Sequence, residues 1–199
     1  KKPDTFVFNS SFFKPFNQRK KLVCWMVSNW RSKFRNEYYY KLNKYINIEV
    51  FGTKTKRIQK FHKCDALSDC KFYLSFENTN HTDYITEKIW YNAFVCGAIP
   101  IVHGTLKKEY LKQNIPSDSF IHTDDFANTD ELAKYIHKVD QNKTLYQSYF
   151  NWRRGRDIYF EDPFGTYYCR VVDFFNRRYL KPRKNLRIKE WFFKGWEDN

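Results

Sequence analysis

Two polar segments of the chain combine charged and hydrogen-bonding side chains in a pattern suited to a phosphorylated ligand. Residues 28–35 are basic, and residues 76–88 end in a Glu-Lys pair. A helix that begins near Thr86 would direct free backbone N–H groups and a positive dipole at an anion. Lys88, in the first turn, would oppose that dipole, which makes sense if a phosphate lies between them. Glu87 could accept hydrogen bonds from the two hydroxyls of a ribose.

Structural explanations of the same residues stay open. Glu87 could be a first-turn acid that only favours the dipole, Lys88 a solvated surface charge, and Arg35 an exposed charge on a helix. Neither Gly-x-Gly-x-x-Gly nor Gly-x-x-x-x-Gly-Lys-Ser/Thr occurs, which disfavours ordinary dinucleotide and Walker-type sites. Asp124-Asp125 invites a metal interpretation, but two acids before a predicted helix are more commonly caps. We therefore predict no metal site.

The elements that position these segments follow from the apolar pattern. Short apolar runs predict strands at residues 22–28, 48–52, 71–76, 99–104 and 120–122. Helical spacing predicts helices at residues 33–45, 86–97, 107–114, 130–140 and 143–154, the first with an apolar side of Phe34, Tyr38, Leu42 and Tyr45. This alternation predicts an α/β fold with a parallel sheet covered on both faces. Ligands bind beyond the carboxyl ends of such strands, where the two polar segments should meet.

The composition describes a folded and basic protein. The chain has 199 residues, 42% of them hydrophobic and 21% aromatic, which suits one domain, or one domain and a tail. No apolar stretch approaches the 18 or more residues of a membrane span. Residues 1–63 carry 16 basic and 3 acidic side chains, and residues 176–199 carry 8 and 3. An anionic partner fits this charge, but nucleic acid, acidic lipid and a phosphorylated small molecule all remain admissible.

The cysteines and sequons bear on the cellular compartment. Cysteines occur at positions 24, 64, 70, 96 and 169, without the spacing of a zinc site. Asn-x-Ser/Thr sequons begin at Asn9, Asn80 and Asn142, and together they favour a secreted or lumenal setting. In that setting we expect the targeting segment to lie outside the chain given, because its first residues lack the layout of a signal peptide.

Several motifs, taken in order, resemble those of the α1,3-fucosyltransferases, glycosyltransferase family 10. The signature lies in residues 71–104 and consists of Lys71–Asn78, Asp83–Lys88 and Pro100–Val102. Similar segments flank it, namely residues 22–25 with 27–30, residues 118–122 with 124–126, and residues 149–153. The resemblance covers roughly residues 5–155.

The resemblance implies the donor-binding half of a GT-B glycosyltransferase, with a Rossmann-like parallel sheet flanked by helices. The GDP-fucose-binding domain would occupy residues 20–175, after a linker or edge segment at 1–19 and before a basic aromatic tail at 176–199. The implied enzyme transfers L-fucose from GDP-β-L-fucose, with inversion, to the GlcNAc of N-acetyllactosamine-type glycans on glycoproteins or glycolipids. No cofactor or metal would be needed, and no nucleic-acid partner is expected. The implied location is the lumenal side of the Golgi membrane, with a type II anchor absent from this chain.

The motif match also implies roles for individual residues. Arg35 and Lys88 would hold the pyrophosphate, Glu87 the ribose, and Glu77, Asn78 and Tyr84 would line the nucleotide-sugar pocket. The general base would be a carboxylate of an acceptor-binding domain that precedes residue 1, so none is assigned in this chain. The resemblance further implies a disulfide between Cys24 and Cys70. An inactive donor-domain relative and a basic nucleic-acid-binding module are the alternative functions.

Overall fold

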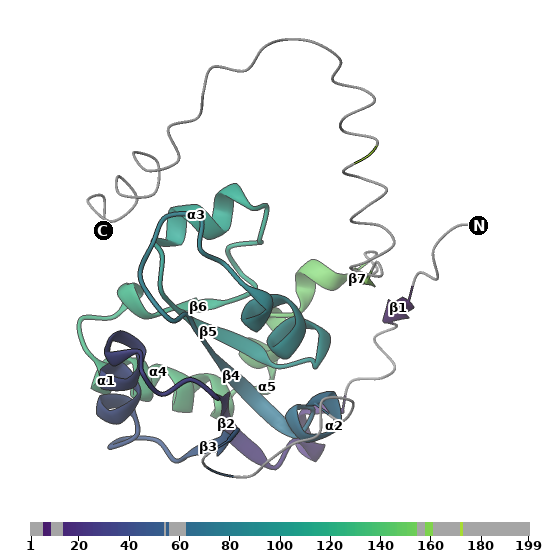
Figure 1. The fold of residues 1–199 in the computed structure, drawn as a ribbon. Coiled ribbons are helices and arrows are strands. Elements are labelled where there is room, and N and C mark those ends of the chain that lie inside the picture. Colours follow the sequence, from purple (N-terminus) through teal and green to yellow (C-terminus); the bar gives the residue numbers. More distant parts are fainter. Residues whose placement is uncertain are drawn as a thin grey trace.

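A parallel sheet forms the centre of the molecule (Figure 1). The computed structural model describes residues 6–8, 14–53, 55, 63–154, 158–160 and 172. The sheet has five strands in the order β3-β2-β4-β5-β6, and every neighbouring pair is parallel. The strands are β2 (Lys21–Met26), β3 (Ile48–Phe51), β4 (Cys70–Phe76), β5 (Ile99–His103) and β6 (Ile121–His122). The predicted fold class is confirmed.

Helices cover both faces of this sheet. They are α1 (Lys33–Leu42), α2 (Lys63–Leu67), the π-helix η4 (Lys88–Val95), α3 (Lys107–Lys112), α4 (Thr129–Gln141) and α5 (Lys143–Ser148). The described residues also include the short 3-10 turns η2 (Phe16–Gln18), η5 (Thr123–Asp125) and η6 (Asn151–Arg153). None of the helices among the described residues is long and apolar enough to cross a lipid bilayer.

Side chains that alternate along the strands divide the interior into separate apolar clusters. Trp25 and Leu74 face α1, α4 and α5 in the largest cluster. Cys24 and Tyr73, each one residue away in sequence, face the opposite cluster, which α2 and η4 complete. Both faces of the central strands are therefore apolar, as the continuous apolar runs in the sequence indicate.

A glycine follows β3 at the point where the chain leaving β2 passes closely. Val27, just after β2, donates its backbone N–H to the carbonyl of Phe51 at the end of β3, at 2.8 Å. Gly52 follows with φ +143°, and a Cβ there would lie 1.8 Å from the carbonyl oxygen of Val27. Only glycine fits this position, and the carboxyl edge of the sheet stays compact as a result.

A second, two-stranded sheet pairs segments far apart in the sequence. Strand β1 (Phe6–Phe8) runs antiparallel to β7 (Ile158–Phe160), and Figure 1 shows the pair beside the main body. Neither strand is predicted by the sequence pattern. The proposed division at residues 19 and 175 stays a prediction, and the tail at 176–199 lies outside the described residues.

Helix α1 differs from the helix that the sequence predicts at residues 33–45. Helix α1 ends at Leu42, and Tyr45 lies beyond it with 50% of its surface exposed, so the predicted apolar side was wrong at that position. The buried side of α1 consists of Arg35, Asn36, Tyr39 and Leu42. Phe34 lies at the margin of this side and stacks on His103, with ring centroids 4.2 Å apart.

Candidate functional site

The two polar segments meet beyond the carboxyl ends of β2 and β4. Ser32, at the start of α1, donates its hydroxyl hydrogen to the backbone carbonyl of Asn78 at 2.5 Å. Arg35 donates to the carbonyl of Phe76 at 3.4 Å and also to the carbonyl of Asn29. These bonds join the loop after β2 to the loop after β4, so the structure brings together the segments that the sequence analysis expected to share a crevice.

Arg35 is a buried part of this junction, with 2% of its surface exposed. The exposed-helix explanation of Arg35 was therefore wrong. Its guanidinium lies over the Trp25 ring, 5.5 Å from the centroid, and its Nε has no hydrogen-bond partner among the described residues. Burial lowers the pKa of Arg35, and the nearby charge of Glu77 opposes this effect. Because arginine keeps its proton in proteins, Arg35 provides a fixed positive charge at the crevice.

Lys88 lies in a buried ion pair rather than in solvent. Its side chain is 10% exposed, and its Nζ lies 2.7 Å from Oε2 of Glu77, whose side chain is 2% exposed. Nζ also lies 2.6 Å from the hydroxyl oxygen of Thr86. The surface-charge explanation of Lys88 was therefore wrong.

The carboxylate of Glu77 is buried and accepts hydrogen bonds from Thr86 and Lys88. Its Oε1 accepts a hydrogen bond from the backbone N–H of Thr86 at 2.8 Å, and both oxygens lie 2.9 Å from the hydroxyl of Thr86. With the ammonium of Lys88, three donor groups occupy one carboxylate. Thr86 thus contacts Glu77 and is not the predicted N-cap, a position that Glu87 takes at the start of η4.

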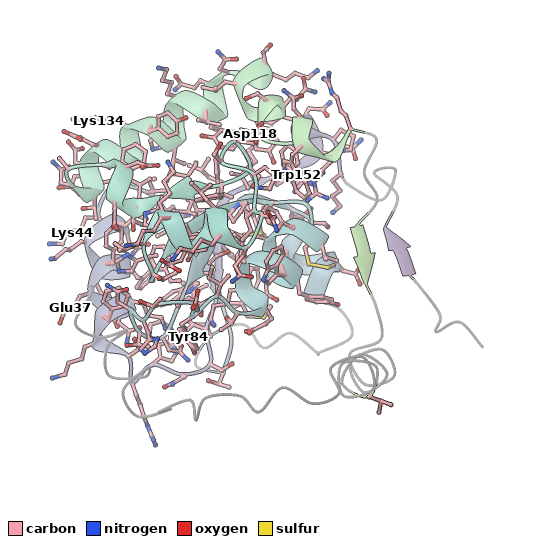
Figure 2. The ribbon with its side chains drawn as sticks, turned by 90° about the horizontal axis from the view of Figure 1, so that it is seen from above. Glu37, Lys44, Tyr84, Asp118, Lys134 and Trp152 are labelled. Carbon is pink, nitrogen blue, oxygen red and sulfur yellow. A yellow bond between two sulfur atoms is a disulfide. The ribbon has the colours of Figure 1, made fainter. Side chains whose placement is uncertain are left out.

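The remaining predicted residues lie along the loop between Glu77 and Lys88. The side chain of Glu87 is 64% exposed, and its Oε1 lies 3.8 Å from Nζ of Lys88, which is too long for a hydrogen bond. Tyr84 is half-buried, and Figure 2 shows it on the side of the molecule away from Lys134 of α4. Asn78 is half-buried as well, with its backbone carbonyl bound to Ser32. All three residues lie in the segment that leads from the end of β4 to the start of η4.

Disulfides fix the elements beneath the crevice. Cys24 of β2 and Cys70 of β4 are joined, with Cα atoms 5.8 Å apart, which is the pair that the resemblance implies. A second disulfide joins Cys64 of α2 to Cys96 at the end of η4, with Cα atoms 4.7 Å apart. This second bond ties α2 to the helix that carries Lys88.

The three sequons differ in their surroundings. Asn9 lies outside the described residues. Asn80 lies in the loop that carries Tyr84, and its Oδ1 is buried without a hydrogen-bond partner among the described residues. Asn142 is exposed between α4 and α5, where its Oδ1 caps α5 by accepting from the backbone N–H of Leu145 at 2.9 Å.

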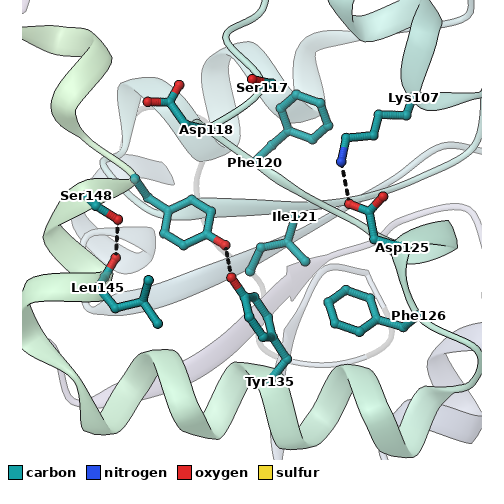
Figure 3. Close-up of a pocket in the computed structure, with 11 residues that line it drawn as sticks. Lys107, Ser117, Asp118, Phe120, Ile121, Asp125, Phe126, Tyr135, Leu145 and Ser148 are labelled. Atoms are coloured by element: carbon teal, nitrogen blue, oxygen red, sulfur yellow. Dashed lines mark hydrogen bonds and ion pairs between the residues drawn. The ribbon is translucent and has the colours of Figure 1, made fainter.

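A cavity of about 430 Å³ lies elsewhere, among α3, β6, α4 and α5 (Figure 3). None of the six predicted donor residues lines it. Two pairs of its polar groups bind each other: Lys107 pairs with Asp125 at 2.6 Å, and the hydroxyls of Tyr135 and Tyr149 lie 2.7 Å apart. This cavity is therefore separate from the residues that the sequence predicts for donor binding.

No metal centre is found in the part of the chain that the structure describes, because no three His, Cys, Asp or Glu side chains converge there. The acids that invited a metal interpretation, Asp124 and Asp125, lie in the 3-10 turn η5. His103 and His122 are buried beside this turn, and burial together with the charge of His122 lowers the pKa of His103 to about 4. His103 is therefore uncharged at neutral pH.

The sequence pattern does not predict the contacts that Ser32 and Thr86 make. Both residues bind the loop after β4 through a hydroxyl group. The period of two along β4 does contain a signal, because it sends Ser75 and Glu77 toward the η4 side of the sheet, like Tyr73. No pattern in the sequence indicates that Ser32 contacts a carbonyl 46 residues away.

Known proteins resemble this chain in both sequence and fold. The family described as glycosyltransferase family 10 (fucosyltransferase), C-terminal part, matches residues 16–191. The 4-galactosyl-N-acetylglucosaminide 3-alpha-L-fucosyltransferase 9 of Rattus norvegicus is 40% identical over 94% of this chain and 52% of its own length. Alpha-(1,3)-fucosyltransferase 4 of Homo sapiens is 34% identical over 92% of this chain and 35% of its own.

A solved structure supports the same relationship. The crystal structure of an alpha1,3-fucosyltransferase with GDP-fucose superposes with a TM-score of 0.60 and 30% identity, over 69% of this chain and 40% of that one. The chain therefore spans about half the length of the rat relative, and less of the others. On the match of residues 16–191 and these identities, the chain belongs to glycosyltransferase family 10, the fucosyltransferases.

Proposed function

We propose that this chain is the donor-binding part of an α1,3-fucosyltransferase and binds GDP-β-L-fucose in the crevice beyond β2 and β4. One observation carries the proposal: two cations reach consecutive residues at the end of β4. Arg35 contacts the carbonyl of Phe76, and Lys88 contacts the carboxylate of Glu77. Two fixed positive charges at one crevice suit the two negative phosphates of a nucleoside diphosphate.

The proposed contacts follow the positions of the side chains. Arg35 and Lys88 bind the pyrophosphate, and the exposed carboxylate of Glu87 binds the ribose hydroxyls. Asn78 and Tyr84, half-buried in the same loop, line the pocket for the nucleotide sugar. Glu77 contributes through its ion pair with Lys88.

The proposed reaction is transfer of fucose with inversion. The acceptor hydroxyl attacks C1 of fucose from the face opposite to the diphosphate, the bond from C1 to GDP breaks, and a general base takes the hydroxyl proton. Arg35 and Lys88 stabilise the negative charge that develops on the leaving diphosphate, so this step needs neither a metal ion nor an organic cofactor. The name of the rat relative gives its acceptor as a 4-galactosyl-N-acetylglucosaminide. We extend this acceptor class, the GlcNAc of N-acetyllactosamine-type glycans, to the enzyme that contains this chain.

The proposed location is the lumen of the Golgi, in an enzyme held by a type II membrane anchor. Two disulfides among the described residues support an oxidising compartment, because such bonds are rare in proteins of the cytosol. The exposed sequon at Asn142 is consistent with passage through the secretory pathway.

Calorimetric titration of the chain with GDP tests donor binding. We expect GDP to bind, guanosine to bind more weakly because it lacks the diphosphate, and the chelator EDTA to leave the GDP affinity unchanged. An inactive relative that has lost the donor site would bind neither ligand. A nucleic-acid-binding module would instead bind unrelated oligonucleotides in a salt-sensitive way, and GDP would not displace them.

A further inference from the structure

We propose that Glu77 and Thr86 are positioning residues that hold the ammonium of Lys88 toward the pyrophosphate of the donor. The inference rests on the proposed function and assigns Glu77 a role other than lining the pocket. Lys88 is held at its backbone carbonyl by Ser75 of β4 and at its ammonium by Glu77, the residue that follows β4.

The strand in question is β4. Its side chains alternate between two faces, so Ser75 and Glu77 point the same way, toward η4. The hydroxyl of Ser75 donates to the backbone carbonyl of Lys88 at 3.2 Å, and the carboxylate of Glu77 accepts from its Nζ at 2.7 Å. The lysine therefore lies along the end of β4 with both of its ends fixed.

The head of Lys88 has a defined direction because of these contacts. An ammonium has three N–H groups. Glu77 and Thr86 lie at 2.7 and 2.6 Å and take two of them, while Glu87, at 3.8 Å, is too distant to take the third. A phosphate oxygen can accept from this third N–H without breaking the existing bonds, so no side chain has to be reordered when the donor binds.

The same carboxylate also closes the donor loop. Glu77 and Thr86 stand at the two ends of the segment that contains Asn78 and Tyr84, and the backbone N–H of Thr86 donates to Glu77 at 2.8 Å. A glycine leaves room for this arrangement, since a Cβ at Gly104 would lie 3.0 Å from the Cβ of Glu77. One acid thus fixes both the cation and the loop that carries the other proposed contacts.

The opposite effect of Glu77 has to be weighed, because its negative charge repels a phosphate. If charge were its main influence, removal of that charge would strengthen GDP binding. If positioning dominates, removal weakens GDP binding. The Thr86 hydroxyl separates the two effects, because its loss changes no charge.

The test compares Glu77→Gln and Thr86→Val with the unaltered chain by titration with GDP and with guanosine. We expect each substitution to raise the Kd for GDP about tenfold, the scale of one charge-assisted hydrogen bond, while the Kd for guanosine changes less than about twofold. In a Lys88→Ala background, neither substitution should weaken GDP binding further, because the group that they position is absent.

Asp140→Asn is the matched control. Asp140 pairs with Lys71, which lies at the other end of the same strand, so this change breaks a Lys–Asp ion pair of β4 far from the crevice. We expect it to lower the melting temperature and to leave both affinities unchanged.

The outcomes separate this inference from the proposed function. A chain that binds no GDP before substitution contradicts the proposed function, and the inference with it. A chain that binds GDP, but binds it equally well or better after Thr86→Val and Glu77→Gln, contradicts the inference alone. An equal loss of affinity for GDP and for guanosine also contradicts the inference. So does an undiminished loss of GDP affinity when the substitutions are made in the Lys88→Ala background. If Glu77→Gln fails to fold, Thr86→Val decides the matter.

Discussion

Cys64 and Cys96 form a disulfide that joins the short helix α2 to the end of the π-helix η4, with Cα atoms 4.7 Å apart. Only five residues form α2, fewer than an isolated helix needs for stability in water. The covalent bond and the burial of Leu67 hold this turn against the apolar cluster beneath η4. The helix that carries Lys88 is therefore fixed at its far end by a bond outside the sheet.

The first prediction concerns the two disulfides. Proteolysis of the non-reduced, oxidised protein should yield one peptide that joins Cys24 to Cys70 and another that joins Cys64 to Cys96. Replacing either pair by alanine should lower the free energy of unfolding by about 2–4 kcal/mol, because each bond closes a loop of tens of residues. Urea unfolding measures this loss. Recovery of these cysteines as free thiols by mass spectrometry would contradict the prediction.

The second prediction concerns the proposed pyrophosphate contacts. Arg35→Ala and Lys88→Ala should each weaken GDP binding by about 1.5–3 kcal/mol, roughly 10- to 150-fold in Kd, because each removes a charge-assisted hydrogen bond. Arg31→Ala is the control, since Arg31 is exposed in the same loop. Isothermal titration calorimetry measures all three. Unchanged GDP affinity in both of the first two variants would remove these residues from the site.

The same arginine also supports the fold, which gives a separate expectation for its variant. Arg35→Ala should lower the melting temperature more than Arg31→Ala, because it leaves the carbonyls of Phe76 and Asn29 without this donor, whereas Arg31 is exposed. Differential scanning calorimetry without ligand measures this difference. Equal melting temperatures would show that Arg35 does not stabilise the junction of the two loops.

The third prediction concerns acid. His103 keeps its lone pair down to a pKa of about 4 in the folded protein, whereas the ordinary value is 6.5. The unfolded chain therefore binds a proton first as the pH falls, and stability is lost between about pH 6.5 and about pH 4. The loss reaches about 3 kcal/mol at most, from the size of the pKa difference.

Urea unfolding at neutral pH and near pH 4.5 measures this loss. His103→Leu should show a smaller decrease in stability between the two conditions than the unaltered protein. His137→Ala, which changes an exposed histidine of α4, should show the same decrease as the unaltered protein. A His103→Leu variant with an undiminished decrease would show that another group governs acid unfolding.

The fourth prediction concerns N-glycosylation in a secretory host. Asn142 should carry a glycan, because it is exposed and its amide nitrogen is not needed for the cap that its oxygen provides. Asn80 should not, because its side-chain oxygen is buried in the loop of the crevice. Glycopeptide mapping after expression in animal cells checks both positions, with Asn142→Gln as the variant that should lose the modification. A glycan at Asn80 would contradict this view of the loop.

Much of the sheet could be predicted because the central strands are buried on both faces. The apolar runs around Trp25 and Ile101 have no polar interruption, and only Ser75 interrupts the run around Leu74. The limits of these runs therefore agree closely with β2, β4 and β5. The segment that contains α2 is polar and short, and tertiary contacts hold it in place. Its five-residue helix is therefore too short to be predicted from a helical repeat of apolar residues. The pairing of Cys64 with Cys96 likewise depends on distance in the fold and not on spacing.

At the site, the sequence indicated which residues are near one another but not how their side chains are directed. Residues Arg35, Glu77 and Lys88 follow strand ends, and that rule alone brings them to one edge of the sheet. The inward turn of Glu77 results from the path of the loop that returns at Thr86. A loop path depends on backbone angles such as the positive φ of 61° at Asp83, which no local pattern at that residue requires.

The π-helical form of η4 has a consequence for changes in chain length. A π-helix forms i→i+5 hydrogen bonds, so each turn holds more residues than an α-helical turn that spans the same path. Deletion of one residue between Trp90 and Phe94 could restore i→i+4 bonding while both ends stay in place, with Lys88 still beside β4 and Cys96 still bonded to Cys64. Insertion of one residue cannot be accommodated by a return to i→i+4 hydrogen bonding. This helix should therefore tolerate shortening by one residue better than lengthening.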